Sequence, residues 1–163
     1  MKRPIKYSTY ASAVTIIVLL VLAAATVFAI YNLSNKLLFG CTIFIVLVIT
    51  NIALWYAPMS LSLADGVLSI NRSMRIKDIP VADIASVRMC PPTMAARRIC
   101  GSGGFMGYWG LFSEPDLGRY FAYYGRASDC FLVTLRDGRR YMLGCTDAPA
   151  MVAAIRSEMS NAE

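Results

Sequence analysis

The residues best placed to do chemistry lie between Arg97 and Phe112. The arginine pair Arg97 and Arg98 precedes a stretch that reads Gly-Ser-Gly-Gly-Phe-Met-Gly from residue 101. A glycine-rich backbone beside basic side chains can cradle a phosphate group. This stretch nevertheless fails the nucleotide-binding patterns, because Met106 stands where the dinucleotide fingerprint needs its third glycine. The lysine and hydroxyl of a phosphate-binding loop are also missing.

The rest of the chain contains no recognisable catalytic set. It has no histidine, which is the commonest general base and metal ligand. Its five cysteines form no CxxC motif or other metal-ligand spacing, so we predict no metal site and no cofactor. Acidic residues such as Asp65, Asp137 and Asp147 stand at predicted turns or at a helix start. The sequence therefore predicts that the protein is not an enzyme.

Two interpretations of the glycine-rich segment remain. The glycines could let the backbone bend while large apolar side chains form an exposed hydrophobic surface that binds a protein partner or lipid. Alternatively, the same side chains close the mouth of a β-barrel. The arginine pair could hold an anionic lipid head group or an acidic partner, or could face solvent. Under the first interpretation, the contact candidates are Arg97, Arg98, Gly101, Gly103, Gly104, Phe105, Met106, Tyr108, Trp109 and Phe112.

Two uncharged stretches near the start of the chain must position this segment. Residues 10–30 and 37–56 are dominated by Val, Ile, Leu, Ala and Phe. Each has about the 20 residues needed to cross ~30 Å of hydrocarbon. The short polar segment 31–36 suits a tight turn, so residues 1–58 are predicted to form a basic N-terminal flank and a transmembrane helical hairpin. Asn51 is the candidate for hydrogen bonding between helices, either within the hairpin or with a second copy.

The charge distribution predicts an orientation for this hairpin. The flank carries Lys2, Arg3 and Lys6, basic residues also follow the second apolar stretch, and the turn has only Lys36. Because basic flanks favour the cytoplasmic side, both termini and the remaining domain are predicted to be cytoplasmic. A reducing cytoplasm also argues against disulfides. Beyond residue 58 the positive excess is small despite the overall charge of +6, which argues against nucleic-acid binding.

Residues 59–163 have the pattern of one β-rich domain that ends in a helix. The Asp65-Gly66 pair predicts a tight hairpin turn. After Thr146, which could cap a helix, apolar residues recur at helical spacing as far as Met159. About seven short strands are predicted, at 59–64, 67–71, 75–79, 84–90, 119–126, 130–135 and 140–143.

The run from Arg75 to Val87, Arg-Ile-Lys-Asp-Ile-Pro-Val-Ala-Asp-Ile-Ala-Ser-Val, resembles bacterial pleckstrin-homology-like (PH-like) domains. The resemblance covers roughly residues 59–160, and the glycine-rich segment Gly101–Gly110 is similar to one subgroup of membrane-anchored members. It implies an all-β PH-like barrel, partly open and strongly bent, with about seven strands and a C-terminal capping helix. It also implies an inner-membrane protein of a bacterium.

Two functions fit these features. The first is a membrane-tethered PH-like binding module that engages a protein partner or the membrane surface. The second is a structural or assembly subunit of a membrane complex that acts through its transmembrane hairpin. The predicted partners are the membrane itself, a protein partner or second copy of the chain, and anionic lipid.

Overall fold

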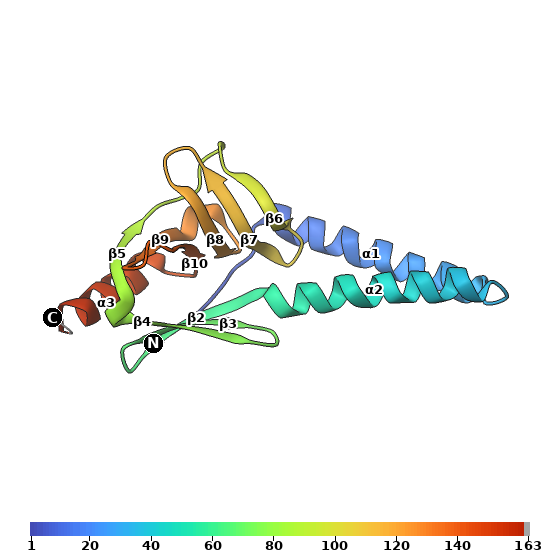
Figure 1. Cartoon of the computed structure of the whole chain (residues 1–163), viewed down its shortest axis with the longest axis horizontal. Helices are drawn as coiled ribbons and strands as arrows, with labels where there is room; N and C mark the ends of the chain where they lie inside the picture. The colour runs from blue at the N-terminus through green and yellow to red at the C-terminus, as the bar shows by residue number, and fades with distance from the viewer. Residues whose placement is uncertain (162–163) are drawn as a thin grey trace.

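The computed structural model describes residues 1–161 and has two long helices extending from one end of a β-rich domain (Figure 1). The predicted domain end at Glu163 lies outside the described residues. Helix α1 (Thr9–Tyr31) and helix α2 (Lys36–Tyr56) run side by side. Both are long and apolar enough to cross a membrane, and few of their residues are buried. The two predicted apolar helices are thus confirmed.

The first sheet has four antiparallel strands in the order β1-β2-β3-β4. The predicted hairpin turn at Asp65 and Gly66 is present, and both residues have positive φ, at 52° and 72°. Such a turn matches the twist of paired strands. The strands are β1 (Lys2–Pro4), β2 (Pro58–Ala64), β3 (Val67–Arg72) and β4 (Ile76–Pro80).

The second sheet has six strands in the order β5-β9-β10-β8-β7-β6. Its neighbours pair antiparallel except β10 and β8, which are parallel. The two sheets form a PH-like fold but do not close into a barrel. The strands are β5 (Ile84–Met89), β6 (Arg97–Gly104), β7 (Gly107–Glu114), β8 (Gly118–Tyr124), β9 (Cys130–Leu135) and β10 (Arg140–Gly144), with short helical turns η1 (Val81–Asp83) and η2 (Ala127–Asp129).

The strand count of about seven was too low, because the glycine-rich segment itself forms β6 and β7. Glycine is depleted in strands, so its abundance there concealed the pairing. At Gly101 and Gly110 the two backbones come so close that a Cβ on either residue would lie within 2.1 to 2.3 Å of a carbonyl oxygen on the other strand. Glycine is therefore required for this pairing.

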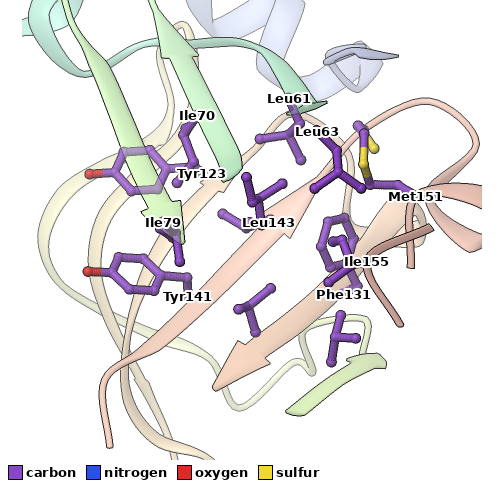
Figure 2. Close-up of a cluster of buried hydrophobic side chains, with 14 of the residues drawn as sticks. Leu61, Leu63, Ile70, Ile79, Tyr123, Phe131, Tyr141, Leu143, Met151 and Ile155 are labelled. Carbon is purple, nitrogen blue, oxygen red and sulfur yellow. The ribbon is translucent and has the colours of Figure 1, made fainter. Parts of the chain in front are cut away.

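The main core lies where the inner faces of the two sheets meet the C-terminal helix α3 (Ala148–Asn161) (Figure 2). The first sheet contributes residues such as Leu61 and Ile70, and the second contributes Phe131 and Leu143. A second buried cluster includes alternate residues of β8, at positions 120, 122 and 124. Because side chains alternate across a strand, the six-stranded sheet is covered on both faces.

The sequence did not predict the N-terminal strand β1. The predicted start of α3 was also wrong, because the residues before this helix contact β1. Helix α3 begins at Ala148, so Asp147 and not Thr146 directly precedes it, and the hydroxyl of Thr146 donates a hydrogen bond to the carbonyl oxygen of Pro4 at 3.1 Å. Arg3 forms an ion pair with Asp147 at 2.8 Å. The basic flank therefore includes a strand bound to both β2 and the loop before α3.

Replacement of Ile155 by Asp is expected to destabilise the protein by about 3 kcal/mol or more, because an unpaired charge would be buried. Ile155 is fully buried in the core. Chemical denaturation of the full chain in detergent measures the effect. Ala153→Asp on the exposed side of α3 is the control. Equal stability of the two variants would contradict the docking of α3.

Candidate functional site

The glycine hairpin, defined as β6, β7 and the turn Phe105–Met106 between them, touches the first helix at its tip. The hydroxyl of Thr15 accepts a hydrogen bond from the backbone N–H of Met106 at 2.9 Å. The same hydroxyl donates to the carbonyl oxygen of Ala11 at 2.7 Å, as helical threonines often do. Figure 1 shows β6 reaching the start of α1. The tip of the hairpin is thus attached to the base of a candidate membrane helix.

Glycines on the domain side make this close approach possible. A Cβ on Gly104 would lie 3.1 Å from the ring of Tyr10 in α1. A Cβ on Gly125 would lie only 2.3 Å from the carbonyl oxygen of Lys6, just before α1. The backbone of Gly125 also accepts a hydrogen bond from Ser8 at 2.8 Å. The domain and the start of α1 therefore meet backbone against backbone, with no room for side chains.

Trp109 connects the glycine hairpin to the second helix. Its ring stacks on Tyr56, the last residue of α2, with ring centroids 5.5 Å apart. Its indole N–H donates to the carbonyl oxygen of Phe105 at 3.0 Å, and the side chain is only 7% exposed. Phe105 and Met106 are half-buried against the same core. The stacked rings of Trp109 and Tyr56 thus join the domain to the end of α2.

A groove runs past the opposite side of the glycine hairpin, next to the segment between β5 and β6. Its volume is about 490 Å³, and Tyr108 in it stacks on Tyr124 with centroids 4.8 Å apart. Met94 stands fully exposed at its edge. We call it the aromatic groove, and its lining residues are Pro92, Thr93, Met94, Ala96, Tyr108, Phe112, Tyr124 and Ala127.

A second open pocket of about 500 Å³ shares Met94 with the groove and has the carboxylate of Glu114 in its wall. Glu114 is buried and accepts hydrogen bonds from the hydroxyls of Tyr120 at 2.6 Å and Thr93 at 2.8 Å. Burial and this hydrogen bond raise the pKa of Tyr120 well above its usual value. Glu114 thus holds the segment between β5 and β6 against the sheet through its hydrogen bond with Thr93.

The structure divides the predicted contact candidates into separate groups. Trp109 packs on Tyr56 of α2, and Phe105 and Met106 pack against the main core. Tyr108 and Phe112 line the aromatic groove. The other candidates lie along β6. Arg97 borders the pocket that contains Glu114, whereas Arg98 and Gly101 are exposed. Gly103 is next to Arg98, and Gly104 contacts α1. Sequence reasoning missed Pro92, Met94 and Tyr124, because the two prolines at 91 and 92 only marked the end of a strand.

Asn51 lies on the exposed surface of α2. Its side-chain N–H donates to the carbonyl oxygen of Leu47 in the same helix at 2.9 Å. Within residues 1–161 the side-chain amide of Asn51 makes no other hydrogen bond, so Asn51 does not link α2 to α1.

The described residues contain no group of three His, Cys, Asp or Glu side chains that could hold a metal ion. The five cysteines are free thiols. Burial raises the pKa of the Cys145 thiol to about 12 and raises that of Cys130 further. Since the thiolate is the reactive form, both buried thiols are inert near neutral pH.

Comparison with known proteins adds one match. A family model described as a bacterial PH domain matches residues 59–159. The matched region contains the glycine hairpin, the aromatic groove and most of α3, and it leaves out β1 and both apolar helices. No curated protein and no solved structure matches the chain.

Replacement of Thr15 by Val is expected to cost about 1 to 2 kcal/mol, because the Met106 N–H loses its acceptor. Thr26→Val is the matched control, since the Thr26 hydroxyl bonds only to its own helix among the described residues. Thermal unfolding of the full chain in detergent compares the two. Hydrogen exchange at the Met106 amide should accelerate in the first variant alone. Unchanged exchange there would mean that the tip is not bound to α1.

Proposed function

Because the chain belongs to the bacterial PH domain family, we propose that it is a membrane-tethered binding module whose PH domain engages a protein partner or the membrane surface. It performs no catalysis. The observation that carries the proposal is the absence of a flexible linker. Ala57 alone separates α2 from β2, and it is completely buried. With α1 and α2 in an inner membrane, the domain is held at the bilayer surface in one orientation.

The pairing of β1 with β2 supports a common location for the N-terminus and the domain. Lys2 of β1 pairs with Ser62 of β2, and both helices lie between these two residues in the sequence. Two strands that share hydrogen bonds must lie on the same side of a membrane that α1 and α2 cross. The basic residues Lys2, Arg3 and Lys6 then favour the cytoplasmic side.

A cysteine introduced at Ser34, in the turn between the helices, should react with a membrane-impermeant maleimide in intact cells. A cysteine at Ser160 in α3 should react only after the cells are opened. The parent chain, with its five native cysteines, provides the background. Labelling of Ser160→Cys but not Ser34→Cys in intact cells would reverse the proposed topology.

The aromatic groove is the surface that best suits a protein partner. It is open, floored by Tyr108, Phe112 and Tyr124, and has an exposed methionine at its edge. Aromatic residues and methionine are enriched at protein interfaces. Because the glycine hairpin is attached to α1, the groove keeps a constant distance from the bilayer.

The second candidate function, assembly through the helices, is favoured by Asn51. A side-chain amide that faces lipid with an unused oxygen gains from a hydrogen bond to another helix. Such contacts are worth about 1 kcal/mol in membranes, which is enough to bias the association of helices that already pack well.

A photoreactive amino acid placed singly at Met94, Asn51 or Asp137 distinguishes these functions in native membranes. Cross-linked products should form from Met94 and not from Asp137, which lies in the exposed turn between β9 and β10. Products from Asn51 alone would favour assembly through the helices. Products of equal yield from Met94 and Asp137 would contradict a specific groove.

A further inference from the structure

A polar pocket lies beside the end of α2, away from the aromatic groove. It has a volume of about 360 Å³ and is formed around the turn between β3 and β4. Figure 1 shows this turn next to the first residues after α2. We call it the basic pocket, and its lining residues are Arg72, Arg75, Ile76, Lys77, Asp78 and Tyr123.

Arg72 is held in place by aromatic rings. The central carbon of its guanidinium lies 5.6 Å from the ring centre of Tyr123 and 5.9 Å from that of Tyr56. Its Nε atom is buried and has no hydrogen-bond partner among residues 1–161. A buried donor without a partner is costly. The two rings therefore hold the guanidinium in place, and among the described residues no ion pair engages its terminal N–H groups, which are left for an anion.

The pocket has an excess of positive charge. Within the described part of the chain, Arg72, Arg75 and Lys77 form no ion pair with a carboxylate. The lining carboxylate of Asp78 already accepts a hydrogen bond from the hydroxyl of Ser69 at 2.6 Å. The pocket lining thus has three cations and one engaged carboxylate, which leaves a net attraction for anions. The ammonium of Lys77 lies 5.3 Å from the ring centre of Tyr141.

The position of the pocket suggests where the anion comes from. Arg72 is the strand partner of Pro58, which is two residues beyond the end of α2. If α2 crosses the bilayer, as the proposed function requires, this places Arg72 at the level of the lipid head groups. The turn at Asp65 and Gly66 lies at the other end of β3, farther from the helices.

We propose that the basic pocket binds the phosphate of an anionic lipid in the adjacent leaflet. A guanidinium can present two parallel N–H groups to phosphate oxygens. The cytoplasmic leaflet is negatively charged and attracts cations held near its surface. Such a lipid would fix the rotation of the domain about α2, in addition to its distance from the membrane.

Tryptophan quenching in bilayers tests this proposal on the full chain. Trp55 lies on the exposed surface of α2 and precedes Tyr56, whose ring the guanidinium of Arg72 covers. The protein is reconstituted in phosphatidylcholine containing either brominated phosphatidylglycerol or brominated phosphatidylcholine at the same mole fraction. The anionic lipid should quench more strongly. Its preference should fall by about fivefold for each cation removed in Arg75→Gln and Lys77→Gln.

The control is the double variant Arg88→Gln and Arg119→Gln, which removes two exposed cations elsewhere on the domain and should retain the preference. Equal quenching of the parent by both lipids, or an equal loss in the control, would overturn the lipid site. Loss of the preference on addition of glycerol phosphate would assign the pocket to a soluble phosphate and overturn the lipid assignment. Absence of quenching by either lipid would instead contradict the membrane position of the helices.

Discussion

The direct connection of α2 to β2 through one buried residue is the constraint on which the other contacts depend. A helix that runs into a strand without a linker sets the direction of that strand, and β2 lies at the centre of the first sheet. Its neighbours β1 and β3 are then placed as well. β1 leads within a few residues into α1, so both helices are anchored to the same sheet. The glycine hairpin reaches α1, and Arg72 reaches the end of α2, because this geometry is fixed.

The two sides of the glycine hairpin serve different neighbours. Trp109 and the tip residues contact the helices, while Tyr108 and Phe112 belong to the groove and to the second buried cluster. A strand presents alternate side chains to opposite faces, and the glycines add bends where the backbones touch. One short element therefore connects a candidate membrane anchor to a candidate binding surface without an intervening flexible loop.

Much of the fold could be predicted because its signals are local. Long uncharged stretches, the Asp65-Gly66 turn and the spacing of Ile155 and its neighbours each reflect chemistry within a short window. Strands β6 and β7 could not be predicted, since glycine has low strand propensity and close backbone approach becomes apparent only when both strands are present. β1 was missed for a related reason. Its partner lies sixty residues away, and three residues carry no periodicity.

The candidate site was located only in part. A sequence can indicate that the segment from Phe105 to Phe112 is unusual, but it cannot say which face each ring occupies. Because alternate side chains of a strand point to opposite faces, Trp109 and Phe112 lie in different buried clusters. The groove also depends on Thr93, in the segment between β5 and β6, whose hydroxyl donates a hydrogen bond to Glu114 at the end of β7. Neither residue, taken alone in the sequence, indicates that the two are in contact.

The late pairing of β1 has a consequence for how the protein assembles. The residues of β1 must wait for β2, which follows both helices in the chain. Closing so long a loop is slow compared with forming local hairpins. Until then the edge of β2 is open and the domain is incomplete. In the proposed membrane topology, the first sheet can be completed only after both helices have been made and have returned the chain to the side on which β1 lies.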